Sequence, residues 1–303
     1  MFEKAREMKV IDIDPELLRR YALASIHAGN EAWTHMEAEF VGNVDRLMTT
    51  LVDKEPLAYT IVPEILPDGS VRSPLTTTFA GVRECYVFVR GRSDLLNVEL
   101  VSEIRGGWYD FQVGVNTGRV RENNPEGKVT NSVTIGVFPV SKGKGITGEL
   151  VWVMTPREKL GAGPSPEGPP LSGFDGRRQL LALHKQFLDG YRANSVEAVL
   201  ETMNDGVQAN IRDYVTDTGT LIGIESKADY RTYLREFFAR YEVRQVDHLQ
   251  RLSEDWFLFA ETRFELRERC SRGRDFGIHT AEFFVPAKDD RIIVQTGHGT
   301  DLP

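Results

Sequence analysis

One run of residues occurs twice in this chain, and this repeat constrains the fold more than any other feature. Residues 43–53 read NVDRLMTTLVD, and residues 195–205 read SVEAVLETMND. Each copy follows a long amphipathic stretch and precedes a strand-like run, a glycine (Gly81 or Gly223), a further helix and a series of strands. A repeated α+β unit predicts two domains of the same architecture.

The length agrees with this division, because 303 residues is about twice the usual size of a single hydrophobic core. The clearest boundary is the run TPREKLGAGPSPEGPPLSGF at 155–174, which is rich in glycine and proline and almost free of large apolar residues. Such a composition favours an exposed linker over a helix or a strand. We therefore expect a first domain at 15–154, a linker at 155–174 and a second domain at 175–303.

The composition disfavours several partners. A net charge of −8 opposes non-specific binding to nucleic acids and to anionic membranes, since both repel a negatively charged protein. No run of about 18 apolar residues is present, and the initial MFEKARE carries charges where a signal peptide needs an apolar segment. Cys85 and Cys270 fall in different expected domains and offer neither a disulfide framework nor a metal-ligand spacing. These features favour a cytoplasmic location.

Hydrophobic periodicity predicts three helices followed by strands in each half. In the first half we expect helices at 15–40, 43–52 and 82–95, and strands at 58–62, 98–104, 108–121, 131–140 and 146–154. In the second half we expect helices at 177–194, 196–203 and 227–241, and strands at 207–215, 243–251, 256–267, 278–285 and 291–298. The expected fold class is α+β, with two cone-shaped domains, each of three helices packed on a curved antiparallel sheet.

Both halves resemble the SnoaL-like polyketide cyclases and their relatives, the superfamily of nuclear transport factor two, ketosteroid isomerase and scytalone dehydratase. The resemblance lies in the repeated run at 43–53 and 195–205, in Gly81 and Gly223, and in the closing hairpin at 282–294. It covers most of both domains. The superfamily includes isomerases, dehydratases, cyclases, dehydrochlorinases, epoxide hydrolases and non-catalytic binding domains, so the fold alone selects no reaction.

The resemblance places an acid or a base near the end of the first helix, fourteen residues before the aspartate that closes each repeated run. That position is Glu39 in the first domain and Tyr191 in the second. His35 stands four residues before Glu39, so both side chains project from one helical face. A carboxylate beside an imidazole in an apolar cavity can take up and return a proton, because burial moves both pKa values toward neutrality. A solvated pair on the helix surface is the alternative.

The resemblance places a second carboxyl on the penultimate strand, at Glu282. A hairpin that turns at 287–290 pairs Glu282 with Gln295 and His279 with His298. Side chains alternate along a strand, so only one of these pairs can face the cavity. The family position favours Glu282, the apolar residues that share a face with His279 favour the histidines, and the sequence leaves both open.

The first strand of the second domain carries a third group of polar residues. Asn210, Arg212 and Tyr214 share one face, and Asn210 stands where isomerase-like members hold their general base. Because asparagine cannot accept a proton, isomerase activity is disfavoured in this domain. Arg212 is expected either to bind an anionic substrate group or to pair with Glu265 or Glu282.

In the first domain the equivalent strand offers Tyr59 and Glu64. Trp108 and Tyr109, which follow two glycines, can supply an aromatic wall for a planar ligand or form ordinary core.

Other classes of site are not indicated. The six histidines are scattered without a His-x-x-x-His pair, and no Gly-x-Ser-x-Gly motif is present. The glycines at 143–145 belong to a hairpin turn rather than to a phosphate-binding loop. We therefore expect no metal and no nucleotide, flavin or haem cofactor, which leaves cofactor-independent acid–base chemistry.

The expected function is that of a lyase or isomerase, of dehydratase or cyclase type, acting on a small hydrophobic, aromatic or polycyclic substrate. The expected catalytic residues are Glu39, His35 and Tyr59, and the expected substrate-binding residues are Trp108, Tyr109, Tyr191, Arg212 and Glu282. A non-catalytic module that binds a small molecule or mediates assembly is the alternative. Because superfamily members usually dimerise through the convex sheet face, we expect an internal pseudo-dimer or a homodimer.

Overall fold

The computed structural model describes residues 14–60, 63–121, 127–141, 143–164, 171–216, 219–270 and 273–301. The middle of the expected linker, 165–170, and the charged start of the chain lie outside the described residues. The helices of the first domain are α1 (Pro15–Val41), α2 (Val44–Met48) and α3 (Phe79–Arg92). The helices of the second domain are α4 (Gly173–Arg192), α5 (Val196–Leu200) and α6 (Lys227–Arg240), and a 3-10 turn, η1, spans Arg157–Lys159. Among the described helices, none is long and apolar enough to cross a bilayer.

Each domain contains one large sheet. The first has the strand order β4-β1-β9-β7-β6-β5, with β8 paired to β7, and the second has the order β11-β10-β15-β14-β13-β12. The strands of the first domain are β1 (Ala58–Thr60), β2 (Glu64–Ile65), β3 (Val71–Arg72), β4 (Leu75–Thr76), β5 (Ser93–Arg105), β6 (Tyr109–Val120), β7 (Val129–Ser141), β8 (Gly145–Ile146) and β9 (Gly148–Val153). Those of the second are β10 (Met203–Arg212), β11 (Leu221–Ile224), β12 (Tyr241–Ser253), β13 (Leu258–Glu268), β14 (Asp275–Pro286) and β15 (Ile292–Asp301).

The two strand orders follow the same path, which confirms the predicted fold class of two α+β domains with three helices each. The sheets are antiparallel except for one pair in each domain, since β1 runs parallel to β9 and β10 runs parallel to β15. The short strands β2 and β3 form a separate hairpin. The repeated run also has the same local role in both copies: the side chains of Asn43 and Ser195 cap α2 and α5 by accepting the backbone N–H of the residue three positions on.

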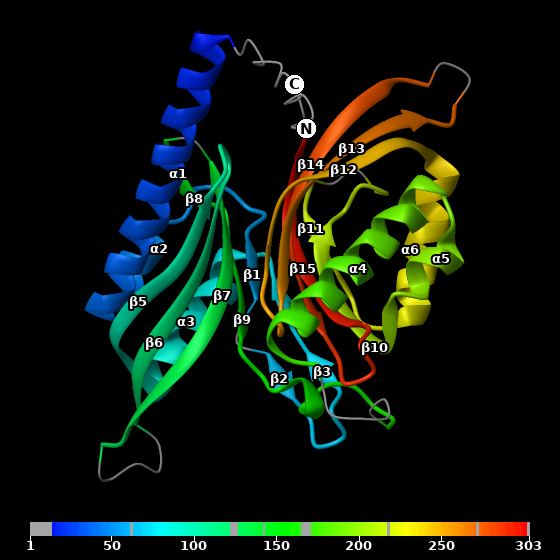
Figure 1. Ribbon diagram of the computed structural model, residues 1–303. Coiled ribbons are helices and arrows are strands. Elements are labelled where there is room, and N and C mark those ends of the chain that lie inside the picture. The colour runs from blue at the N-terminus through cyan, green and yellow to red at the C-terminus, as the bar shows by residue number, and fades with distance from the viewer. Residues whose placement is uncertain are drawn as a thin grey trace, which may run out of the picture.

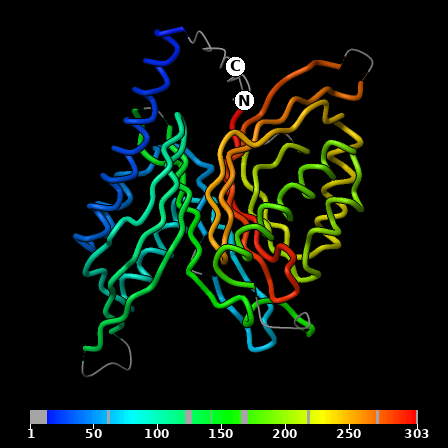
Figure 2. Tube along the Cα trace, in the orientation of Figure 1, coloured from blue at the N-terminus to red at the C-terminus, as the bar shows by residue number. Residues whose placement is uncertain are grey.

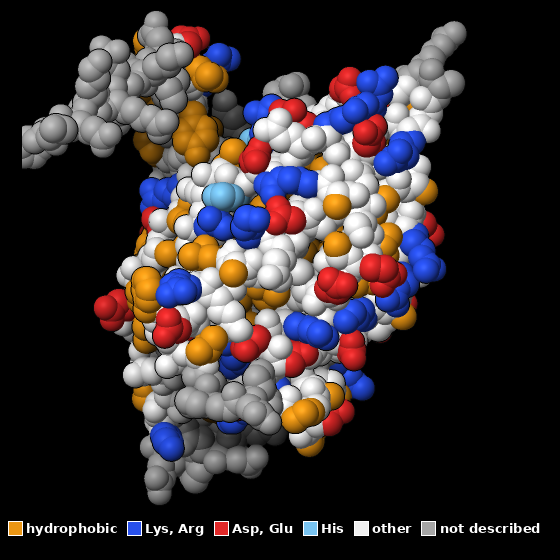
Figure 3. Space-filling model, turned by 45° about the vertical axis from the view of Figure 1, so that its right-hand side comes forward, with side chains coloured by type: hydrophobic (Ala, Val, Ile, Leu, Met, Phe, Trp, Pro, Cys, Tyr) orange, Lys and Arg blue, Asp and Glu red, His pale blue; other side chains and the backbone are white. Residues whose placement is uncertain are grey.

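The two sheets face each other in the middle of the molecule, and the helices cover their outer sides (Figures 1 and 2). The facing residues form one apolar cluster drawn from both domains, in which the ring of Phe111 stacks on that of Phe259 with centroids 4.0 Å apart. On the face drawn in Figure 3, basic and acidic side chains are interspersed. The sheet faces that turn away from the helices are thus buried against each other.

Trp108 and Tyr109 belong to this interface, so their predicted role as a wall of the ligand cavity is wrong. Tyr109 is fully buried, and its hydroxyl donates to Glu261 Oε2 of the second domain at 2.9 Å. Trp108 packs edge-on against Tyr109 and lies 6.3 Å from the ring of His298. Strand β6, which begins at Tyr109, is buried on both faces. The alternation of residues in its sequence therefore does not reveal which face looks toward the helices.

We predict that Phe259→Ala lowers the free energy of unfolding by about 3–5 kcal/mol, because it removes a fully buried ring from the contact between the sheets. Chemical denaturation measures the change. Leu249→Ala is the control, since this side chain is 51% exposed on the neighbouring strand and should alter stability by less than about 0.5 kcal/mol. Equal effects of the two substitutions would contradict the importance of this contact.

Candidate functional site

The first domain encloses a cavity of about 280 Å³ between α1, α3 and the sheet face that looks toward the helices. The cavity exists because small residues occupy that face of β6 and β7. Those that line it are Gly114, Gly118, Thr130, Ser132, Thr134 and Gly136. Apolar side chains from α1, α3 and β5 complete the wall, among them Met36, Val89 and Leu100.

The second domain has space for only about 30 Å³ at the corresponding place, roughly the volume of one water molecule. Large side chains from its helices and sheet fill the cone, and those around the remaining space include Phe187, Tyr191, Tyr233, Phe237 and Phe264. The cone of the first domain is therefore open, whereas large side chains close the cone of the second domain.

Three carboxylates line the open cavity, and of these Glu39 and Glu149 are more deeply buried than Asp94, which pairs with Arg121. Glu39 comes from the last turns of α1, and Glu149 comes from β9, where it interrupts an otherwise apolar strand. Arg90 of α3 donates from Nη2 to Glu39 Oε1 at 2.7 Å, and the two side chains are only 11% and 20% exposed. Burial raises the pKa of Glu39, the charge of Glu149 raises it further, and Arg90 opposes this rise.

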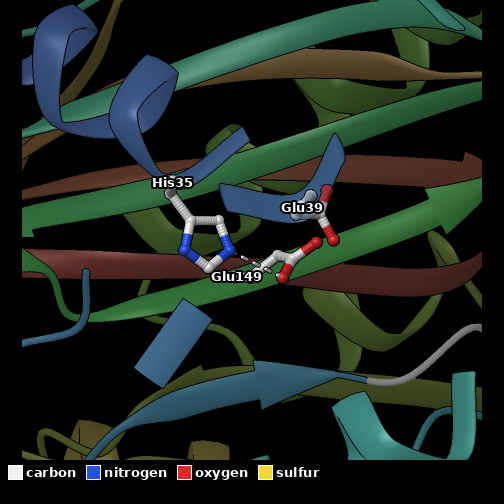
Figure 4. A group of neighbouring side chains, drawn as sticks. All are labelled: His35, Glu39 and Glu149. Atoms are coloured by element: carbon white, nitrogen blue, oxygen red, sulfur yellow. Dashed lines mark hydrogen bonds and ion pairs between the residues drawn. The ribbon is translucent and has the colours of Figure 1, made fainter. Parts of the chain in front are cut away.

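His35 and Tyr86 stand behind Glu149 rather than in the cavity wall. His35 Nε2 lies 3.4 Å from Glu149 Oε2, and the Tyr86 hydroxyl lies 3.1 Å from each of these two atoms. Figure 4 shows the imidazole of His35 and the carboxylate of Glu39 projecting from the same helix toward Glu149. The predicted neighbours His35 and Glu39 therefore converge on a third residue, and neither belongs to a solvated surface pair.

The hydrogen bonds of His35 define what this cluster can do. Its Nδ1 lies 2.6 Å from Thr50 Oγ1, and that hydroxyl donates to the carbonyl of Leu47 at 2.7 Å. Nδ1 therefore carries hydrogen, and Nε2 is turned toward the carboxylate of Glu149. A contact between Nε2 and a carboxylate oxygen is favourable only when one of the two atoms holds a proton.

Glu149 is the residue that sequence reasoning missed. Its signal is a single acidic residue within the run Gly148–Val153, which is otherwise apolar. The odd-numbered residues of this strand line the cavity, whereas Leu150 and Trp152 point into the contact between the sheets. An ionisable residue in phase with the cavity-facing positions of a buried strand is the pattern that could have identified it.

Tyr59, the third predicted catalytic residue, also lines the cavity. Its ring packs edge-on against that of Tyr86 with centroids 4.9 Å apart. Burial raises the pKa of Tyr59 well above its usual value, so the phenol stays protonated and can act only as a hydrogen-bond donor or as a weak acceptor.

The same cluster contains the donor atoms of a conceivable metal site, since atoms of His35, Glu39 and Glu149 lie within 4.8 Å of one another. The guanidinium of Arg90, however, lies 2.7 Å from Glu39 Oε1. A fixed positive charge this close to the cluster opposes the binding of a metal cation.

In the closed cone, Glu282 belongs to one polar chain surrounded by aromatic rings, among them that of Tyr191. Tyr230 donates to Gln295 Oε1 at 2.6 Å, and Gln295 and Thr280 donate to the two oxygens of Glu282, each at 3.2 Å. Burial raises the pKa of Glu282 to about 7. Glu282 and Gln295 therefore occupy the face of the hairpin that looks toward the helices.

The expected pairing in this hairpin is wrong by two residues. Glu282 lies opposite Gly297, and His279 lies opposite Thr300. The turn is therefore longer than the sequence suggested. His279 and His298 face the contact between the domains, where His279 Nδ1 lies 3.6 Å from Glu261 Oε1.

Arg212 lines the closed cone but is bound elsewhere. Its guanidinium donates to the carbonyl of Gly299 at 2.9 Å and to Asp301 at 3.2 Å, so the expected pair with Glu265 or Glu282 is not formed. Asn210 does not point into the cone, because its amide donates to the carbonyl and the hydroxyl of Ser73 in the first domain. A shift in strand register before residue 208 changes which side chains face the helices.

Known structures are similar to single domains of this chain. An LEH-like epoxide hydrolase of M. tuberculosis is 13% identical, with a TM-score of 0.34 over 41% of this chain and 84% of its own. The epoxide hydrolase/cyclase-like enzyme SalBIII is 11% identical, with a TM-score of 0.35 over 42% of this chain and 93% of its own. A Catenulispora acidiphila protein with a ketosteroid isomerase-like fold is 7% identical, with a TM-score of 0.32 over 38% of this chain and 82% of its own.

At such identities and TM-scores these likenesses carry no argument about this chain. No protein-family model matches the chain, and no curated protein sequence matches it. Its chemistry therefore has to be argued from the cavity.

We predict that the stability of the protein falls between pH 4.5 and pH 7 because of Glu282. The native state holds its proton with a pKa of about 7, against 4.5 for an ordinary glutamic acid. The resulting stabilisation is fully present below pH 4.5 and is lost as the pH rises through 7. The loss of unfolding free energy is about 3 kcal/mol. Unfolding free energies of wild type and Glu282→Gln, measured from pH 4.5 to 8, should diverge by this amount; parallel profiles would refute the assignment.

Proposed function

We propose that the first domain is a cofactor-independent acid–base enzyme, an isomerase or a lyase of the dehydratase or cyclase type. The observation that carries the proposal is the pair of cavity-facing carboxylates, Glu39 and Glu149, each held by its own partner. Arg90 binds Glu39, whereas His35 and Tyr86 hold Glu149. Two carboxylates in different environments are what a reaction needs when one group takes a proton and another returns it.

In this proposal Glu149 acts as the general base. It removes a proton from the carbon next to a substrate carbonyl, and the electron pair of that C–H bond moves into the enolate. Glu39, whose pKa is raised, is the general acid. It returns a proton either to a different carbon, which isomerises the substrate, or to a leaving hydroxyl, which departs as water.

The cavity suggests the substrate class. A volume of about 280 Å³, whose walls combine apolar side chains with polar and charged ones, fits a small molecule with an aromatic or alicyclic frame and a polar group. In this proposal Tyr59, which lines the cavity and whose phenol remains protonated, donates a hydrogen bond to the substrate.

We propose that the second domain is not catalytic. Its cone holds about 30 Å³, which leaves no room for a substrate, so Tyr191, Arg212 and Glu282 have structural roles. The packing of the two sheets supports an internal pseudo-dimer, because each domain covers the face through which superfamily members usually dimerise. The two free cysteines fit the proposed cytoplasmic location.

We predict that Glu149→Gln lowers proton transfer at the α-carbon by about 10²–10⁴-fold, because it removes the proposed base, and that Glu39→Gln lowers the complete isomerisation or elimination at least tenfold, because it removes the proposed acid. The assay follows deuterium uptake at the α-carbon of small aryl ketones, beginning with 1-indanone, by NMR in D₂O. Glu37→Gln is the matched control, since Glu37 lies on the same helix but is exposed. The proposal would fail if the Glu149→Gln protein exchanged deuterium at the wild-type rate. It would also fail if wild type exchanged none of the aryl ketones.

A second prediction tests the cavity without touching the carboxylates. Gly114→Val should reduce the same exchange at least tenfold by filling the space, while the melting temperature stays unchanged or rises. A Cβ at residue 114 meets no atom closer than 3.5 Å, and a glycine in a strand costs stability. Unchanged exchange in a folded Gly114→Val protein would place the reaction outside this cone.

A further inference from the structure

A larger groove lies between the two domains, and both domains line it. It measures about 1280 Å³ and runs between the β2–β3 hairpin and the end of α3 on one side and strands β10 and β11 on the other. Asn210 and Ser73, which both line it, are joined by hydrogen bonds across the domain boundary. The groove is therefore held in shape by direct contacts between the domains.

This groove adjoins the cavity that contains the two carboxylates. Three residues line both spaces: Val89 and Ser93 at the end of α3, and Val120 at the end of β6. The cone and the groove therefore share part of their wall. A molecule that extends past these three residues passes from the cone into the groove.

The exposed part of the groove next to this opening is apolar. Phe88 is 50% exposed and Val120 is 43% exposed, and both line the groove. The charges nearby are balanced, since two arginines and two glutamates line the groove. Arg72 lies 3.8 Å from Glu64, and the guanidinium of Arg92 lies 4.1 Å above the ring of Phe88. An uncharged, apolar ligand segment fits these surroundings best.

We propose that the groove between the domains binds the apolar tail of an elongated substrate whose reactive end occupies the first cone. This inference rests on the proposed function and names its substrate class: a molecule with a small carbonyl-bearing head and an extended, uncharged, hydrophobic tail. It also gives the second domain a role, because β10 and β11 supply one wall of the tail site.

The test uses 4-alkylphenols with ethyl, butyl, hexyl and octyl chains, whose binding is measured by calorimetry. The ring and hydroxyl suit the cone, and each added methylene that is buried should strengthen binding about fourfold. Gly223→Trp places a large ring in the groove from the second domain, since Gly223 is exposed and a Cβ there meets only Asn210 Oδ1, at 3.5 Å. We expect Gly223→Trp to leave 4-ethylphenol binding within twofold and to weaken 4-octylphenol at least tenfold.

Gly91→Trp is the matched control, because a Cβ at this exposed position of α3 meets no atom within 4 Å and the residue lines neither space. In this control, binding should strengthen from 4-ethylphenol to 4-octylphenol by the same factor as in wild type. The proposal is overturned if Gly223→Trp leaves 4-octylphenol unaffected, if it weakens all four phenols equally, or if no phenol binds to wild type.

Gly114→Val separates this proposal from the proposed function. It should abolish binding of 4-ethylphenol, which needs only the cone. If 4-ethylphenol binds Gly114→Val as well as wild type, the cone is not the binding site and the proposed function fails. If Gly114→Val no longer binds 4-ethylphenol, but longer alkyl chains do not strengthen binding to wild type, only the tail site is refuted.

Discussion

The packing of one sheet on the other determines where every functional side chain can point. Phe111 and Phe259 stack at the centre of this contact and bury the outward faces of both sheets. Because side chains alternate along a strand, fixing one face toward the partner domain fixes the other toward the helices. Gln112 and Gly114 must then face the first cone when Phe111 and Val113 face the second domain. The position of the cavity is therefore set by the packing of the two sheets, which occurs on the opposite face of the first sheet.

The same backbone path produces two different cones because the residues at equivalent positions differ. Glu149 lies beside Tyr59 in the parallel pair β1–β9, and Gln295 lies beside Ala209 in the parallel pair β10–β15. Each accepts a hydrogen bond from a tyrosine of the third helix of its domain, Tyr86 or Tyr230. A glutamine at this position keeps the hydrogen bond and cannot take up a proton. The second domain therefore lacks an ionisable group at this position, and the same domain has the filled cavity.

Local signals in the sequence predicted the parts of this structure that depend on local interactions. The caps at Asn43 and Ser195 and the shared helix face of His35 and Glu39 follow from spacing within a few residues, and the structure contains both. The role of Glu149 was not predictable in this way, because it lies 114 positions from His35 and the contact exists only after β9 joins the sheet. Register shifts next to Gln208 likewise arise from strand pairing, which periodicity within one segment does not encode.

The charge balance of the open cone links its stability to its chemistry. Glu39 and Glu149 carry two negative charges when both are ionised, and Arg90 supplies one positive charge within hydrogen-bond distance. Burial and the charge of Glu149 raise the pKa of Glu39, whereas Arg90 opposes this rise. Glu39 therefore differs from an exposed glutamate because of the same burial that encloses the cavity. Two carboxylates with different partners beside one cavity are the arrangement that the proposed proton transfer needs.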